Sequence, residues 1–229
     1  MAAPNRHGES AIGNFWTPMN GRHDFFGSVL TGRRGVIFDW DGTLVDNHLR
    51  NYQALCAALA PHRVTVGPQW YRQHCGLPIY ELLRRIPGAR HLPLEQIVTA
   101  SRSGLLASTS PATLVANTTV LDLAEYANTR GLPCAIATGS AAVLVTAGLD
   151  ALGRPNMFRP IVTREDVEHG KPAPDTYLEA ARRLHLDPAV CLAVEDAPDG
   201  IESAHRAGMP VLVVRGNELT DVVYPRHGA

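Results

Sequence analysis

Two aspartates spaced two residues apart, Asp39 and Asp41, directly follow a short apolar run at residues 36–38 and precede Gly42. The apolar run predicts a buried strand. Carboxylates at the end of a buried strand repel each other, and a divalent cation or a raised pKa of one carboxyl group would relieve that repulsion. The motif alone is also compatible with a turn that carries two solvated acids.

Two further polar motifs lie past predicted strands. Thr138, Gly139 and Ser140 would offer hydroxyls and backbone N–H groups to an anion at a helix start, whereas the simpler alternative is an ordinary helix cap by Ser140. Lys171 lies in a stiff loop with one glycine and two prolines, residues 170–175. A fixed ammonium there could neutralise a phosphate oxygen and a neighbouring carboxylate, and the alternative is a solvated surface lysine.

A pair of adjacent acids, Glu195 and Asp196, follows the apolar run at residues 190–194. Together with Asp39 and Asp41 they could form a site built from oxygen ligands, which suits Mg²⁺ better than a soft metal ion. The alternative is a turn that caps the next helix.

Alternating strands and helices must position these residues. Strands are predicted at residues 36–38, 133–138, 160–163, 190–194 and 211–214, and helices at residues 120–129, 140–149, 174–185 and 197–207. This alternation favours an α/β fold with a doubly wound, mostly parallel five-stranded, Rossmann-like sheet. Ligands usually bind at the carboxyl ends of the strands in such sheets, which is where the polar motifs lie.

An all-helical stretch interrupts the alternation. Helices are predicted at residues 47–60, 68–74, 79–86 and 94–107, the first with Asp46 as its N-cap, and no convincing strand occurs between residues 47 and 115. We therefore expect a core domain at residues 35–48 and 116–229 with an inserted all-helical domain at residues 49–115.

Residues 1–34 show no sustained hydrophobic period and predict an N-terminal extension that is largely mobile. Its aromatic residues, Phe15, Trp16, Phe25 and Phe26, could attach it to the body of the protein or to a second subunit. We expect the folded core to begin near residue 35.

The bulk composition narrows the functional classes. The 229 residues are 45% hydrophobic and 19% charged, and the net charge of −1 argues against a nucleic-acid-binding surface built on positive charge. No stretch approaches the roughly 18 consecutive apolar residues of a membrane span, and the amino terminus lacks the pattern of a secretory signal. The cysteines (Cys56, Cys75, Cys134 and Cys191) form no C-x-x-C pair and predict reduced thiols. We expect a cytoplasmic protein without a nucleic-acid or membrane partner.

The chemistry-bearing segments also form an ordered set. They are Phe38-Asp39-Trp40-Asp41-Gly42-Thr43-Leu44-Val45-Asp46, Thr138-Gly139-Ser140, Gly170-Lys171-Pro172-Ala173-Pro174-Asp175 and Glu195-Asp196-Ala197-Pro198-Asp199-Gly200-Ile201, followed by Ala207-Gly208-Met209-Pro210. In this order they resemble the motifs of the haloacid dehalogenase-like hydrolase superfamily, and most closely its phosphoglycolate phosphatase and β-phosphoglucomutase-like branch. The resemblance covers residues 35–48 and 116–216, and the helical insertion matches by position and helical character.

The resemblance implies a role for each core residue. Asp39 would be the nucleophile that forms an aspartyl phosphate, and Asp41 would protonate the leaving oxygen and then activate water. Thr138 and the Gly139 N–H would hold the phosphoryl group, with Lys171 countering its charge. Gly42 and Ser140 would complete the phosphate-binding set.

The same resemblance implies a Mg²⁺ site and a cap. The Asp39 carboxylate, the Asp41 backbone carbonyl and Asp196 would hold the ion, with Glu195 binding it directly or through a neighbouring ligand. The helical domain would be a mobile cap that excludes water and selects the substrate. Arg72 and His74 are candidate substrate contacts on this cap, and ordinary packing within the cap is the alternative for both.

The expected function is hydrolysis of a small phosphomonoester metabolite, such as a sugar phosphate or phosphoglycolate, by a monomer or weak homodimer. A phosphosugar mutase is the alternative, although Asn51 and Ile79 occupy positions where the mutases place a histidine and an arginine. Arg72, or Arg84 or Arg85, could replace that arginine. A non-catalytic phosphate-binding protein is the third possibility.

Overall fold

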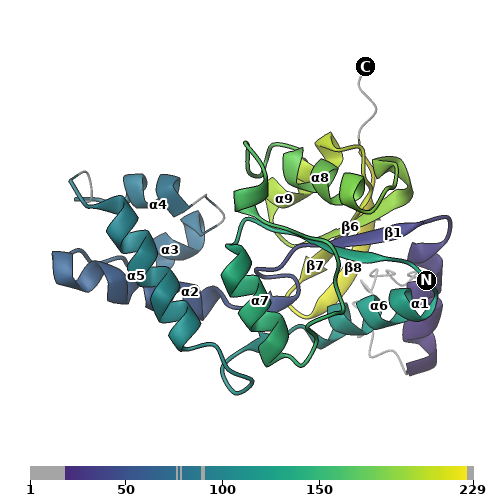
Figure 1. The fold of residues 1–229 in the computed structure, drawn as a ribbon, viewed down its shortest axis with the longest axis horizontal. Coiled ribbons are helices and arrows are strands. Elements are labelled where there is room, and N and C mark those ends of the chain that lie inside the picture. Colours follow the sequence, from purple (N-terminus) through teal and green to yellow (C-terminus); the bar gives the residue numbers. More distant parts are fainter. Residues whose placement is uncertain (1–18, 76, 78, 89–90, 226–229) are drawn as a thin grey trace, which may run out of the picture.

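The computed structural model describes residues 19–225 except 76, 78 and 89–90. A six-stranded sheet with the order β5-β4-β1-β6-β7-β8 forms the centre of the fold (Figure 1). Five strands are parallel, and β8 pairs antiparallel with β7. The strands are β1 (Gly35–Phe38), β4 (Cys134–Ala137), β5 (Ile161–Val162), β6 (Cys191–Glu195), β7 (Val211–Arg215) and β8 (Glu218–Val223).

The sheet confirms the expected doubly wound α/β fold, with one correction to its size. All five predicted strands are present, and the sixth, β8, was not predicted. At the edge of the sheet, each of its residues is exposed or only partly buried, so the strand lacks the buried apolar run that marks the central strands.

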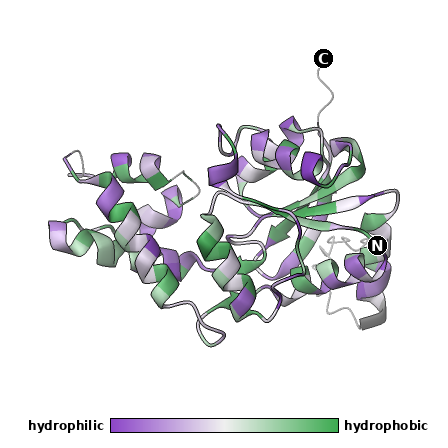
Figure 2. Ribbon diagram, in the orientation of Figure 1, coloured by the Kyte–Doolittle hydropathy of each residue, from purple (hydrophilic) through white to green (hydrophobic). Residues whose placement is uncertain are grey.

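Helices cover both faces of the sheet. On one face lie α8 (Asp175–Arg183) and α9 (Pro198–Arg206), and on the other lie α1 (Met19–Leu30), α6 (Thr118–Thr129) and α7 (Ala142–Ala151) (Figure 1). Successive residues of β1 point to opposite faces, so Val36 and Phe38 join one apolar cluster and Ile37 joins the other. The hydrophobic strands between more polar helices are visible in Figure 2.

The expected mobile extension is wrong for residues 19–30, which form the packed helix α1. Phe26 is 1% exposed, and its ring lies 5.6 Å from the ring of Tyr126 on α6. Arg22 and Asp122 form an ion pair of 2.8 Å between the same two helices. The expected contact of Phe26 with the body of the protein is therefore present, whereas Phe15 and Trp16 lie outside the described residues.

The helical insertion, residues 48–107, has an apolar core of its own. It contains α2 (His48–Leu59), the short helix η1 (Ala60–His62), α3 (Pro68–His74), α4 (Ile79–Arg85) and α5 (Leu94–Ala107). Leu59, Leu83 and Ile97 are almost fully buried among these helices. Two short antiparallel strands, β2 (Val45–Asp46) and β3 (Val115–Ala116), connect the helical insertion to the sheet domain.

Figure 1 shows the helical insertion beside the sheet domain, with α5 passing close to α7. The exact domain boundaries remain a prediction. Within the described residues, none of the helices combines the length and the apolar character that crossing a membrane would need.

Candidate active site

The order of the strands brings the predicted site residues together. Strands β4, β1 and β6 are neighbours and run parallel, so their carboxyl ends meet at one edge. Thr138 follows β4, Asp39 follows β1, and Glu195 ends β6. The loop between the short helix η2 (Arg164–Asp166) and α8 then brings Lys171 to the same edge.

Lys171 lies between two buried carboxylates. Its Nζ atom donates to Asp39 Oδ1 at 2.6 Å and to Glu195 Oε1 at 2.5 Å. Burial by itself lowers the pKa of Lys171, but the charges of Asp39 and Glu195 outweigh it and raise that pKa. Burial raises the pKa of Asp39 well above its ordinary value, although Lys171 acts in the opposite direction. Lys171 is also the only lysine in the chain, a sequence signal that distinguishes it from the surface arginines.

Glu195 already has a donor at each accepting position of its carboxylate. Oε1 accepts from Lys171 and from the buried Tyr177 hydroxyl, the latter at 3.0 Å. Oε2 accepts from the backbone N–H groups of Asp196 at 3.0 Å and Ala197 at 3.2 Å. Because a carboxylate has about four acceptor sites, these contacts leave Glu195 little capacity to bind an ion directly. Sequence reasoning did not select Tyr177.

Asp196 lies against Gly42. A Cβ atom on Gly42 would meet Asp196 Oδ2 at 2.3 Å, and Gly42 has a φ of +85°, so both space and backbone conformation favour glycine there. Thr43 Oγ1 donates to Asp196 Oδ1 at 2.9 Å. Burial, reinforced by the charge of Glu195, raises the pKa of Asp196 to about 6, while the Thr43 hydrogen bond lowers it.

The carboxylates of Asp39, Glu195 and Asp196 form a cluster in which Asp39 and Asp196 could bind a cation, while Glu195 adds negative charge beside it. Each offers an oxygen, and these oxygens all lie within 4.8 Å of one another. Such a set of hard oxygen donors fits Mg²⁺.

The Asp41 carboxylate is held by three side chains. Asn47 Nδ2 donates to Oδ1 at 2.5 Å, Asn51 Nδ2 donates to the same oxygen at 3.3 Å, and Ser140 Oγ donates to Oδ2 at 2.5 Å. Because a hydroxyl can both donate and accept, Ser140 suits either protonation state of Asp41. Sequence reasoning missed the contacts of both asparagines with this acid.

The expected cap of α2 by Asp46 is wrong, and the alternative role of Ser140, a cap of α7, is absent. Helix α7 begins at Ala142, so Ser140 contacts Asp41 and does not cap the helix. Asn47, rather than Asp46, is the N-cap residue of α2, and it forms no side-chain cap. In both places a side chain suited to capping is used for a contact with Asp41 instead.

The loop of residues 138–140 has one constrained and one open position. Thr138 is fully buried, and its Oγ1 accepts from the Ser140 N–H at 3.0 Å, which fixes the turn. A Cβ atom on Gly139 would meet no atom within 4 Å, so space remains beside its backbone. The loop could therefore bind a small anion through its backbone.

The two candidate contacts on the helical insertion do not join this group of core residues. Arg72 is exposed. His74 stacks on Trp70 with ring centroids 4.0 Å apart, and its Nδ1 lies 2.7 Å from the Trp70 carbonyl oxygen. His74 lines a separate cavity of about 700 Å³ together with Arg84, Arg85, Ile86, Pro87, Gly88 and His91.

Two other residues of the helical insertion lie nearer the acids. Tyr71 is buried, and burial raises its pKa, with the charges of Cys75 and Asp41 adding to the effect. His48 Nε2 lies 3.0 Å from where a Gly42 Cβ atom would be. Hydrogen bonding to Cys75 raises the pKa of His48 to about 9, and the charge of Asp196 adds to this. Sequence reasoning had not placed His48 in the site.

A doubly wound core with several acids and one buried ammonium at the carboxyl ends of its strands defines the class of this protein as a hydrolase. Residues 34–208 match the haloacid dehalogenase-like hydrolase family. The chain belongs to this family, as its motifs predicted.

Three relatives illustrate the similarity. The chain is 33% identical over 187 residues to the fructose-1-phosphate phosphatase YqaB of Escherichia coli, covering 79% of this chain and 96% of that protein. It is 35% identical over 201 residues to hexitol phosphatase A of the same organism, covering 79% and 82%. The crystal structure of CbbY from Rhodobacter sphaeroides in complex with phosphate matches with a TM-score of 0.74 at 26% identity, covering 86% and 90%. The family and these names confirm the expected enzyme class, a phosphatase of the haloacid dehalogenase type.

Proposed function

We propose that this protein is a Mg²⁺-dependent phosphatase that hydrolyses a small phosphorylated metabolite through an aspartyl-phosphate intermediate. One observation carries the proposal: the buried Asp39 carboxylate lies 2.6 Å from the Lys171 ammonium and within 4.8 Å of carboxylate oxygens of Glu195 and Asp196. A nucleophile, a fixed positive charge and acids suited to a cation are thus within reach of one phosphoryl group.

The ion would be held by Asp39, Asp196 and the backbone carbonyl of Asp41. The hard oxygen donors of the two carboxylates support this choice. Glu195 would remain bound to Lys171 and Tyr177, because its acceptor positions are occupied. When bound, Mg²⁺ supplies neutralisation of the negative charge on the transferring phosphoryl group.

The protein's own residues would divide the chemistry. Asp39 attacks phosphorus, so that an oxygen–phosphorus bond forms as the bond to the leaving oxygen breaks. Asp41, held by Asn47 and Ser140, gives a proton to the leaving oxygen and then takes one from the water that hydrolyses the intermediate. Thr138 and Gly139 would orient the phosphoryl group, and Lys171 would neutralise part of its charge.

The substrate class is proposed from the relatives. Two of them are named for fructose 1-phosphate and hexitol phosphates, so a sugar or polyol phosphate is the class we infer here. The helical insertion would act as the cap over this substrate, with Asn51, which donates to Asp41, and with His48 and Tyr71 as its residues on the side of the acids. A cytoplasmic monomer or weak homodimer completes the proposal.

The test is phosphate release from a panel of phosphorylated sugars, polyols, glycolate and nucleotides, with Mg²⁺ and with a chelator. We expect Mg²⁺-dependent turnover that Asp39→Asn abolishes, while Asp150→Asn, an exposed acid on α7, retains it. Unchanged turnover in Asp39→Asn would refute the nucleophile. Conversion of a sugar phosphate without release of phosphate, in the presence of a sugar bisphosphate, would identify a mutase instead.

A further inference from the structure

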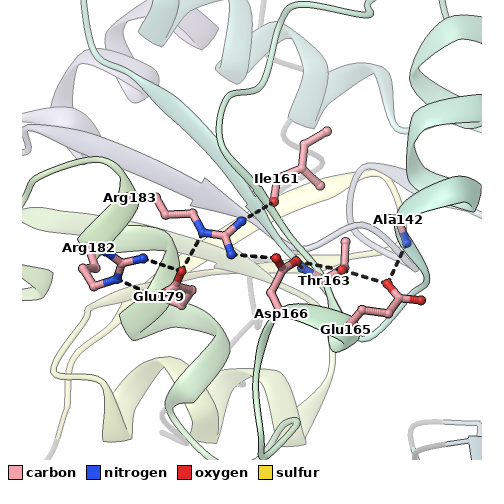
Figure 3. Close-up of polar contacts among 8 residues, drawn as sticks. All are labelled: Ala142, Ile161, Thr163, Glu165, Asp166, Glu179, Arg182 and Arg183. Carbon is pink, nitrogen blue, oxygen red and sulfur yellow. Dashed lines mark hydrogen bonds and ion pairs between the residues drawn. The ribbon is translucent and has the colours of Figure 1, made fainter.

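Helix α7 receives its cap from a residue far along the chain. Ala141, the N-cap residue of α7, has no side-chain acceptor for the free N–H groups of the first turn. Glu165 supplies one: its Oε2 accepts from the Ala142 N–H at 3.0 Å and from Thr163 Oγ1 at 2.9 Å (Figure 3). A carboxylate at this end of a helix is also favoured by the helix dipole.

The segment that carries Glu165 runs beside the loop of residues 138–140. The Thr138 N–H donates to the Val162 carbonyl at 3.0 Å, and the Arg164 N–H donates to the Ser140 carbonyl at 3.5 Å. Ser140 in turn contacts Asp41. The loop of residues 138–140 therefore lies between this segment and Asp41, and the Glu165 side chain acts on the end of the loop through its contact with the Ala142 N–H.

A second set of contacts fixes the base of this segment to α8. Asp166 Oδ2 accepts from the Thr163 backbone N–H at 2.8 Å and lies 2.8 Å from the Thr163 hydroxyl, whose one proton is shared between Asp166 and Glu165. Asp166 Oδ1 pairs with Arg183 at 2.6 Å. Arg183 also pairs with Glu179 at 2.6 Å, as Figure 3 shows. The backbone around Glu165 is therefore held by the sheet domain, whatever the helical insertion does.

The other oxygen of Glu165 faces the helical insertion. Glu165 Oε1 lies 3.7 Å from Arg102 Nη2 on α5, and the two side chains are 49% and 44% exposed. One carboxylate thus contacts the first turn of α7 with one oxygen and an arginine of the helical insertion with the other. Arg102 can restrict Glu165 to the rotamer that contacts Ala142 when α5 lies against α7.

We propose that Glu165 is a positioning residue that couples the position of the helical insertion to the phosphate-holding loop. With Arg102 in place, Glu165 stays on the Ala142 N–H and the loop keeps Ser140 on Asp41. When the helical insertion moves away, this restraint weakens and the loop binds phosphate less well. The inference rests on the proposed function, because it assumes that residues 138–140 bind the phosphoryl group.

The experiment is a double-mutant cycle on Arg102→Gln and Glu165→Ala, with Glu165→Gln as the conservative variant. Turnover of the best substrate in the panel gives KM and kcat, and calorimetry gives the Kd of inorganic phosphate. An exposed ion pair contributes little, so Arg102→Gln should raise KM and the phosphate Kd about 2- to 5-fold. Glu165→Ala removes the cap of α7 as well as the contact with Arg102, so it should raise KM and the phosphate Kd about 10-fold. Glu165→Gln should restore part of the difference, because its amide oxygen can still accept from Ala142.

The decisive outcome is non-additivity. In the Glu165→Ala background, Arg102→Gln should change neither value further, since its partner is already gone. The control pair Arg22→Gln and Asp122→Asn removes a similarly exposed ion pair between α1 and α6 and should leave KM and Kd unchanged. The coupling is refuted if the fold-changes of Arg102→Gln and Glu165→Ala multiply in the double variant. It is also refuted if KM and Kd are unchanged in both single variants.

The two proposals can fail separately. If the wild-type protein hydrolyses no phosphomonoester, the proposed function falls, and the phosphate Kd values still decide the coupling. If the wild-type protein turns over substrate but the cycle is additive, the function stands and the coupling is refuted. If the wild-type protein binds no inorganic phosphate and shows no turnover, both are refuted.

Discussion

Replacing Lys171 by methionine would remove a positive charge from between two buried acids. The Lys171 Nζ atom lies 2.6 Å from Asp39 Oδ1 and 2.5 Å from Glu195 Oε1, and the three side chains are 12%, 8% and 1% exposed. Removing one partner of a buried ion pair costs about 3–5 kcal/mol of folding free energy, because the remaining charges are left uncompensated. For a protein of this size, that corresponds to a fall of about 6–20 °C in the midpoint of thermal unfolding.

The size of this loss should depend on pH and on the second acid. Burial raises the pKa of Asp39, and its protonation reduces the uncompensated negative charge, so Lys171→Met should lose less stability at pH 5 than at pH 8. The double variant Lys171→Met/Glu195→Gln should regain part of the stability at pH 8 without regaining activity. The rate of phosphate release should fall about 10²- to 10³-fold in either variant, since a fixed charge at the transferring group is gone.

The assay is thermal unfolding of the chelated protein followed by circular dichroism, with phosphate release measured in parallel. Arg22→Met, which removes one partner of an exposed ion pair with Asp122, is the control and should cost less than about 1 kcal/mol. An unfolding midpoint for Lys171→Met equal to that of the wild type at pH 8, or full activity, would refute the reasoning about the buried pair.

Three further predictions concern Asp196 as a candidate metal ligand and two glycines, Gly200 and Gly139. Burial raises the pKa of Asp196 from 3.8 to about 6, so this group's contribution to the stability of the metal-free protein is complete below pH 4 and is lost as the pH rises through 6. Protons compete with the ion there, so Mg²⁺ should raise the unfolding midpoint at pH 7.5 but not at pH 5, and an equal rise at both would contradict this. Gly200→Ala should destabilise the fold by about 1–3 kcal/mol, because its Cβ would lie 1.8 Å from Glu195 Oε1, as denaturant unfolding can show. Gly139→Ala should leave unfolding unchanged but raise KM, since its Cβ would enter open space at the phosphate-holding loop, and an unchanged KM would argue against phosphate binding there.

The sequence determined the strand-and-turn units that carry the chemistry. Each unit is local: an apolar run buries itself, and the polar residues directly after it must lie at the end of a strand. For this reason the five parallel strands, the all-helical insertion and the positions of Asp39 and Glu195 were predictable. The order of the motifs also predicted the family.

The tertiary structure decided which partner each polar side chain of the site contacts. Asp46 looks like the cap of α2 in the sequence, but Asn47 is the N-cap residue, and its side chain donates to Asp41. Glu195 looks like a metal ligand, yet Tyr177 and Lys171 occupy one of its oxygens. Such choices depend on which elements lie side by side, and local sequence carries no information on that.

The elements that sequence reasoning missed share one property. Helix α1 and strand β8 show weak hydrophobic patterns, and they are stable because they pack on an edge or face that the other elements create. The contact between Glu165 and Ala142 is of the same kind, because it joins residues 23 positions apart across two parallel strands. The sequence alone determined which residues could react, and the packing of distant segments decided which of them meet, because hydrogen bonds and ion pairs act over distance in space and not along the chain.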